Sequence, residues 1–240
     1  MLTLSRRSAR LLLIPLAALL AAACEHNLGP TAGGGGGGGG PGPSLGTAST
    51  YGILAGTAVS CVTGGTIDAD VGVSPGSAIT GFPPCTLTGA RHAADAAAAA
   101  AQVDLTTANN ALVALPCGTT ITADLGGTTL APGVYCSASS VGVTGTVTLN
   151  GGGDPNARFV IQAGSTLTTA GAVALTNGTQ AKNVWWQVGS SATLGTASVW
   201  KGNILALTSI TLNDNANMVG RALARNGGIT LGTNNFITLP

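Results

Sequence analysis

Three short segments near the end of the chain repeat one pattern: Ala192-Thr193-Leu194-Gly195, Ile210-Thr211-Leu212-Asn213 and Ile229-Thr230-Leu231-Gly232. Their threonines are 18 and 19 residues apart. A period of this length, with short strand-like runs and glycine or asparagine at the corners, is typical of a β-solenoid, in which each turn stacks on the previous one. We therefore predict stacked turns over the last quarter of the chain, from Val184 to Leu239.

Within each copy, apolar residues alternate with small polar residues, which predicts strands that bury one side and expose the other. The outward positions carry no charge; they are Ser191, Thr193, Gly195, Ser209, Thr211, Asn213, Gly228, Thr230 and Gly232. Three earlier segments also place two threonines around one apolar residue: Thr120-Ile121-Thr122, Thr146-Val147-Thr148 and Thr166-Leu167-Thr168. Stacked strands lie about 4.8 Å apart, so these threonines are expected to form a regular ladder of methyl and hydroxyl groups.

The composition excludes several classes of protein. Only 7% of the 240 residues are charged and 3% are aromatic, while 38 are glycine. Few side chains remain for acid–base chemistry, and we expect neither an enzyme nor a cofactor. The net charge of +1 gives no electrostatic support for binding nucleic acid. Recurring valine, isoleucine, leucine and threonine argue against disorder over most of the length.

The first residues are typical of an export signal. A basic segment containing Arg6 and Arg7 precedes the apolar run Leu11 to Leu20, and Ala21-Ala22-Ala23-Cys24 resembles a bacterial lipobox. We expect residues 1–23 to be removed and Cys24 to be lipidated; the alternative is an ordinary signal that leaves Cys24 as a free thiol. Glu25 favours the outer membrane or cell surface as the location. Residues 24–44 include eight consecutive glycines, typical of a flexible tether.

The other four cysteines, in an exported domain, indicate disulfides. Three pairings are possible, and proximity in the sequence favours Cys61–Cys85 and Cys117–Cys136. A zinc site is the rival interpretation, but the spacing contains no CxxC motif.

One stretch differs from the strand pattern. Residues 93–101 are nearly all alanine, the strongest helix former, and we predict a helix from about 88 to 115. Thr88 is the expected N-cap, Pro116 marks the stop, and His92 is expected on the helix. Small side chains would let this helix lie close against a flat sheet.

Several segments together resemble the microbial ice-binding protein family with a discontinuous β-solenoid fold. They are Asp70-Val71-Gly72-Val73-Ser74-Pro75-Gly76 with Ile79-Thr80-Gly81-Phe82, Leu130-Ala131-Pro132-Gly133-Val134-Tyr135, Lys182-Asn183-Val184-Trp185-Trp186-Gln187-Val188-Gly189, Lys201-Gly202-Asn203-Ile204-Leu205-Ala206 and Gly220-Arg221-Ala222-Leu223-Ala224. The resemblance covers nearly all of residues 45–240. It implies a mainly β, right-handed, three-faced β-solenoid with one long helix alongside. It also implies adsorption to ice through a broad flat face, and we therefore expect the protein to restrain ice growth or recrystallisation or to attach the cell to ice. We expect a monomer whose only contact with the membrane is the lipid on Cys24.

The family's binding face often carries Thr-Ala/Gly-x-Thr/Asn, which Thr63-Gly64-Gly65-Thr66 matches. Combined with the threonine ladder, this nominates ten ice-binding residues: Thr63, Thr66, Thr146, Thr148, Thr166, Thr168, Thr193, Thr211, Asn213 and Thr230. The plain alternative is that threonine is simply a good strand residue.

The sequence also fits a second function, a non-catalytic surface adhesin or scaffold that binds a glycan or a protein. Trp185, Trp186 and Trp200 are the candidate sugar-stacking platform, although adjacent tryptophans on a strand point in opposite directions. Asp68 and Asp70 lack further ligands for calcium, and we expect them to stabilise a turn and to bind no metal.

Overall fold

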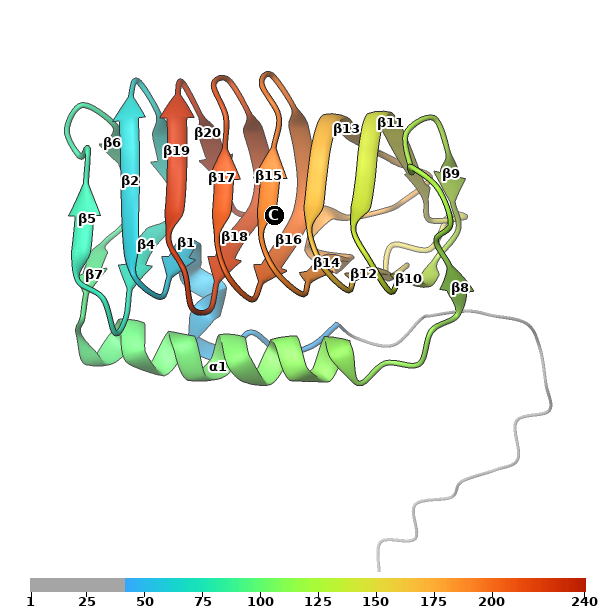
Figure 1. Cartoon of the computed structure of the whole chain (residues 1–240), viewed down its shortest axis with the longest axis horizontal. Coiled ribbons are helices and arrows are strands. Elements are labelled where there is room, and N and C mark those ends of the chain that lie inside the picture. The colour runs from blue at the N-terminus through green and yellow to red at the C-terminus, as the bar shows by residue number, and fades with distance from the viewer. Residues whose placement is uncertain (1–41) are drawn as a thin grey trace, which may run out of the picture. The chain divides into compact units, whose positions relative to one another are not determined.

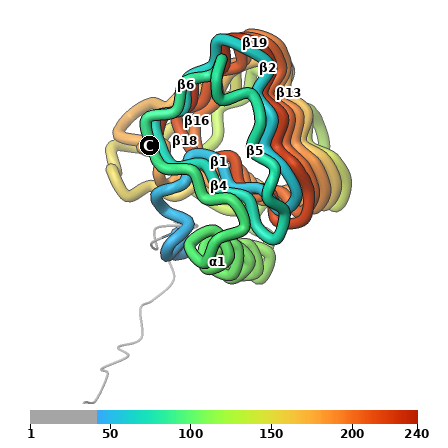
Figure 2. The backbone as a smooth tube through the Cα atoms, turned by 90° about the vertical axis from the view of Figure 1, so that its left-hand side faces the viewer, coloured from blue at the N-terminus to red at the C-terminus, as the bar shows by residue number. Residues whose placement is uncertain are grey.

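The computed structural model describes residues 42–240 as a parallel β-solenoid with three faces and one long helix (Figures 1 and 2). The predicted signal, Cys24 and the glycine run lie outside the described residues. No helix in this part of the chain has the length and apolar character needed to span a membrane.

The first face, which we call the ladder face, lies toward the viewer in Figure 1. It contains, in order along the solenoid axis, β5 (Ala78–Thr80), β2 (Ala58–Thr63), β19 (Ile229–Thr233), β17 (Ile210–Leu212), β15 (Ala192–Leu194) and the first halves of β13 (Leu167–Thr176) and β11 (Val141–Asn150). All of these pairings are parallel, so equivalent residues stack directly.

The second face contains β6 (Thr86–Leu87), β3 (Thr66–Asp68), β20 (Phe236–Thr238), the beginnings of β18 (Asn217–Ala224) and β16 (Val199–Ala206), the second halves of β13 and β11, and β9 (Thr129–Leu130). The third face contains β7 (Arg91–Ala93), β4 (Asp70–Val73), β1 (Tyr51–Ala55), the ends of β18 and β16, β14 (Val184–Val188), β12 (Phe159–Ala163), β10 (Gly133–Ser137) and β8 (Thr119–Thr120). Two short 3₁₀ helices, Gly46–Thr50 and Ala181–Asn183, precede β1 and β14.

The turns do not stack in the order of the chain. The last strands, β19 and β20, lie against β2 and β3, which are about 170 residues away in the sequence: Ile229 pairs with Val59 and Ile237 with Ile67. The C-terminal turn therefore fills the middle of the solenoid, and the turn that contains β5, β6 and β7 forms one end. This interleaving makes the fold discontinuous.

Helix α1 (Ala96–Val113) covers the third face (Figure 2). Its buried side recurs every three or four residues through Ala101, Leu105, Ala108 and Leu112. These side chains pack in one cluster with apolar residues that point out of the solenoid, Leu54, Val160, Trp185, Leu205 and Leu223. A second, larger cluster fills the solenoid interior. The predicted long helix alongside the β-solenoid is confirmed.

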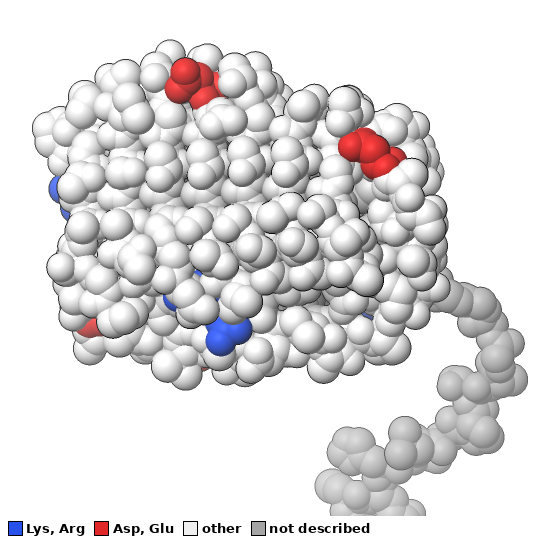
Figure 3. All heavy atoms as spheres, viewed as in Figure 1, with Lys and Arg blue, Asp and Glu red and all other residues white. Residues whose placement is uncertain are grey.

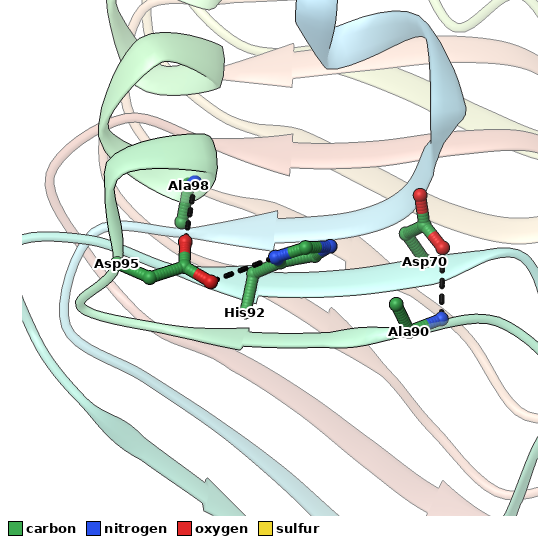
Figure 4. A network of polar contacts seen from close by, with 5 residues as sticks. All are labelled: Asp70, Ala90, His92, Asp95 and Ala98. Atoms are coloured by element: carbon green, nitrogen blue, oxygen red, sulfur yellow. Dashed lines mark hydrogen bonds and ion pairs between the residues drawn. The ribbon is translucent and has the colours of Figure 1, made fainter.

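The helix begins later than predicted, because residues before it complete a solenoid turn (Figure 4). Thr86–Leu87 and Arg91–Ala93 are strands, so Thr88 is not the N-cap and His92 lies on β7, outside the helix. Asp95 is the N-cap: its carboxylate accepts a hydrogen bond from Ala98 N at 2.8 Å. The same carboxylate contacts His92 Nδ1 at 2.8 Å.

Asp68 and Asp70 stabilise the same end of the solenoid. Asp68 accepts a hydrogen bond from Thr88 Oγ1 at 2.6 Å, and Asp70 accepts one from Ala90 N at 2.8 Å. Both carboxylates therefore join neighbouring turns, close to the structural role expected from the sequence. Two disulfides, Cys61–Cys85 and Cys117–Cys136, join neighbouring turns at opposite ends of the solenoid in the pairing that the sequence favoured.

Candidate functional site

The ladder face carries a continuous column of hydroxyl side chains along its centre. Strand register stacks one outward residue from each of six successive strands: Thr80, Ser60, Thr230, Thr211, Thr193 and Thr168. Successive strands lie about 4.8 Å apart, so the column presents one hydroxyl per strand at a constant spacing. Ser60 Oγ lies 3.5 Å from Thr230 Oγ1, which links two adjacent rungs.

Uncharged residues with short side chains flank the central column on both sides. Outward positions before it hold Ala78, Ala58, Gly228, Ser209, Ser191, Thr166 and Ser140, and those after it hold Val62, Gly232, Asn213, Gly195, Ala170 and Thr144. Ser140 Oγ and Thr166 Oγ1 are 2.8 Å apart in the first of these columns. Because the side chains are short, the surface stays close to the plane of the sheet.

The residues beneath the face keep it rigid. Ile210, Leu212, Ile229 and Leu231 alternate with the outward residues and are at most 1% exposed. Identical or similar aliphatic side chains stack beneath successive strands and keep these strands at the same distance from the solenoid core. A rigid, repeating outer surface follows from this repeating interior.

The strands of the ladder face contain no charged residue among the described segments. Figure 3 shows this face as an uncharged area, with acidic atoms confined to its upper edge and one end. Two carboxylates border this face: Asp214, in the turn after β17, accepts a hydrogen bond from β19, and Asp124, between β8 and β9 at the end of the solenoid opposite β5, accepts one from β11. Asp214 accepts a hydrogen bond from Thr233 N at 2.7 Å, which fixes it at the corner.

The other two faces are different. Helix α1 covers the third face, which removes that face from contact with a large partner. The second face carries a charge of each sign, Asp68 and Lys201, on its strands, and it exposes the aromatic side chain of Phe236 (49%). Only the ladder face combines exposure, flatness and the absence of charge.

The structure divides the ten predicted residues between two faces. Six of them lie on the ladder face: Thr166, Thr168, Thr193, Thr211, Asn213 and Thr230. Thr66, Thr146 and Thr148 lie on the second face, and Thr63 ends β2 at the corner between the two faces, paired with Thr233. The ten residues therefore do not share one plane, and the ice-binding role of each stays a prediction.

Sequence reasoning missed Thr80 and Ser60, which extend the central column by two rungs. Their strands lie far from the repeat in the sequence and share no motif with it. The usable signal was the alternation Ala58-Val59-Ser60-Cys61, which predicts a strand but does not reveal its neighbour.

The tryptophans and the acidic residues that could suggest sugar or metal binding do not form such sites among the described residues. Trp185, Trp186 and Trp200 are at most 5% exposed, so none of them offers a stacking platform for a sugar. Within residues 42–240, no group of three or more His, Cys, Asp or Glu side chains is placed to hold a metal ion.

These features define a β-solenoid with one free, flat, uncharged and hydroxyl-bearing face. The chain belongs to the Ice-binding-like family, whose family model matches residues 53–237. An ice-binding protein of Nostoc sp. (strain HG1) is 53% identical over 194 residues, which span 79% of this chain and 72% of that relative.

Solved structures agree with this assignment. An ice-binding protein from an Antarctic biological consortium superposes with a TM-score of 0.81 at 45% identity, covering 82% of this chain and 91% of the other. An ice-binding protein from the Antarctic ascomycete Antarctomyces psychrotrophicus gives a TM-score of 0.79 at 40% identity, covering 83% and 98%. The family resemblance and the fold predicted from the sequence are confirmed.

Proposed function

We propose that the protein binds ice through the ladder face and thereby restrains ice growth or recrystallisation, or attaches its cell to ice. The observation that carries this proposal is the column of six neutral hydroxyl groups in strict register on an exposed, uncharged sheet. Family membership and the names of the relatives support the same function.

The physical basis is recognition by shape and repeat. Ice is an extended periodic surface, so a rigid face with regularly spaced hydroxyl and methyl groups can contact it at many points at once. Rigidity keeps the entropic cost of adsorption low, because few side chains lose freedom on contact. Neutral hydroxyl groups exchange hydrogen bonds with water without the large hydration free energy of a charge. This mode of action needs no catalytic group and no cofactor.

The test compares a bulky substitution on each exposed face. Thr211→Tyr places a phenol ring in the middle of the central column, and Thr146→Tyr places the same ring on the second face. We expect ice-affinity partition and thermal hysteresis to fall to near background in Thr211→Tyr and to stay at the wild-type level in Thr146→Tyr. Full activity in Thr211→Tyr together with loss in Thr146→Tyr would move the site to the second face.

The alternative of a glycan- or protein-binding adhesin has a separate readout. Failure of the folded wild-type domain to enter growing ice, combined with binding to a glycan array, would favour that alternative. The burial of all three tryptophans gives it little support.

We further propose that the protein is an exported lipoprotein, anchored through Cys24, and acts as a monomer. The point at which the chain enters the domain suits an anchored protein. Gly42 lies against the Trp185 ring, and Thr47 donates from its N and Oγ1 atoms to Asp104 of α1 at 2.7 Å each. This segment packs beside α1, away from the ladder face (Figure 2). An anchor at this end leaves the ladder face free to meet ice.

Two variants test the anchor. Labelled palmitate should enter the wild-type protein in a bacterial host, and Cys24→Ser should abolish the label and release the domain from the membrane fraction. Cells that display the anchored protein should be captured by a growing ice front, and cells that display anchored Thr211→Tyr should not. Equal membrane retention of Cys24→Ser would contradict lipidation at this cysteine.

A further inference from the structure

The central column continues beyond Thr168 through a glycine to an aspartate. Thr168 pairs with Gly142 of β11. Leu125 N donates to Gly142 O at 2.9 Å, in the pattern that joins neighbouring parallel turns, and this places Asp124 beside Gly142. Leu125 is buried in the core and Asp124 is exposed, as alternation requires. The six hydroxyl rungs are thus followed by one bare rung and one carboxylate.

The carboxylate of Asp124 folds back over the bare rung. A Cβ atom added to Gly142 would lie 2.4 Å from Asp124 Oδ2, so the carboxylate occupies the space that a threonine side chain would fill at this position. Three hydrogen bonds fix it there: Gly126 N donates at 2.7 Å, Thr144 N at 2.8 Å and Thr144 Oγ1 at 3.1 Å. The position of the charge is therefore defined by the backbone of both turns.

The carboxylate is ionised at neutral pH. Partial burial raises the pKa of Asp124, but the hydrogen bonds from Thr144 and Gly126 outweigh it and leave the pKa below its ordinary value. An ionised carboxylate orders its nearest water molecules around its own charge. Contact with ice at this rung would require that hydration to be lost, which is costly for a charge.

We propose that Asp124 is a residue that limits ice binding: it ends the ice-contacting area at the Thr168 rung and keeps β11 out of contact with ice. This inference rests on the proposed function of the ladder face. It assigns a boundary to the site, and it makes the area of that site adjustable by a single side chain.

The test neutralises the carboxylate in two ways. Asp124→Asn keeps the shape and an oxygen acceptor for Thr144 N and Gly126 N, and Asp124→Ser supplies a smaller neutral acceptor. The matched control is Asp154→Asn, which removes one carboxylate from the exposed turn between β11 and β12, where Asp154 accepts a hydrogen bond from Asn156 N at 2.8 Å. Circular dichroism and the melting temperature confirm that each variant is folded.

We expect both Asp124 variants to raise thermal hysteresis, and Asp154→Asn to leave it unchanged. Extension from six rungs to seven, at the constant strand spacing, corresponds to about a 1.2-fold increase in contact length. Unchanged activity in the folded Asp124 variants, with activity still lost in Thr211→Tyr, would overturn this inference and leave the proposed function intact. Wild-type activity in Thr211→Tyr would instead be a failure of the proposed function.

Discussion

Removal of either disulfide should cost similar stability, but only one removal should weaken ice binding. Cys61 and Cys85 are 24 residues apart, and Cys117 and Cys136 are 19 apart. Loop-closure entropy predicts about 3.4 kcal/mol for the longer separation and about 3.2 kcal/mol for the shorter. Replacement of each pair by alanine should therefore lower the free energy of unfolding by nearly equal amounts.

The functional consequences should differ because the disulfides hold different faces. Cys61 lies on β2 of the ladder face and ties it to the end turn that contains β5. Among the described strands, β5 pairs on this face only with β2, through Ala58–Ala78, Val59–Ile79 and Ser60–Thr80. Loss of this disulfide should let the Thr80 rung open locally. Cys136 lies on β10 of the third face, and its loss leaves the six hydroxyl rungs in place.

Three measurements on the two double variants, Cys61→Ala/Cys85→Ala and Cys117→Ala/Cys136→Ala, test this reasoning. Urea unfolding followed by circular dichroism gives the stability change, amide hydrogen exchange reports opening of β5, and thermal hysteresis reports ice binding. We expect fast exchange at Ile79 and Thr80 and reduced hysteresis in the first variant only. A stability loss below about 1 kcal/mol in both would contradict the entropy argument; equal hysteresis in both would contradict the role of the Thr80 rung.

Three further predictions concern stability. Leu212→Ala should lower the free energy of unfolding by about 2–5 kcal/mol in urea melts, because Leu212 is fully buried beneath the central column. Arg221→Leu should cost about 1–3 kcal/mol, because Arg221 donates to Ser49 O (Nη2, 2.7 Å) and to Asn203 Oδ1 (Nη1, 2.9 Å), and the substitution leaves the buried Asn203 Oδ1 without this donor. Stability should also fall as the pH drops below 3.8, the ordinary carboxyl pKa. The reason is that hydrogen bonds from Ala98 and His92 lower the pKa of Asp95, so its ionised form stabilises the folded state. Thermal melts from pH 2 to 7, with Asp95→Asn as the control, check this prediction.

Much of the fold could be predicted from the sequence because neighbouring solenoid turns repeat the same short pattern. The 18- and 19-residue spacing predicted the stacking of β15, β17 and β19, and the structure pairs Thr193 with Thr211 and Thr211 with Thr230. The pairing of β19 with β2 could not be predicted, because the segments around Ile229 and Val59 have no motif in common. Residue alternation defines which side of a strand is buried but carries no information about which strand lies beside it.

Thr146 and Thr148, which were predicted to lie with the ladder-face residues, show a second limit of prediction from the sequence. Thr144, Thr146 and Thr148 alternate regularly in one ten-residue strand, so the sequence pattern assigns them to one surface. The strand turns a corner at Gly145, where φ is 92°, a conformation that glycine adopts without strain. Thr144 thus stays on the ladder face while Thr146 and Thr148 move to the second face. Val143 and Val147 are buried on either side of the corner and Gly145 between them is exposed, so the glycine is the only mark of the corner in the sequence.

The ends of the solenoid show how one side chain serves both folding and function. An exposed strand edge invites pairing with another molecule, and proteins protect such edges with charge, proline or a covering turn. Asp124, between β8 and β9, accepts a hydrogen bond from the backbone N of Thr144 on β11. At the opposite end, Pro83 and Pro84 follow β5, and Cys85 anchors the turn to β2. The carboxylate that accepts this β11 hydrogen bond is also the charge that we propose limits the ladder face, so one side chain contributes both to the closure of this end of the solenoid and to the extent of the ice-contacting area.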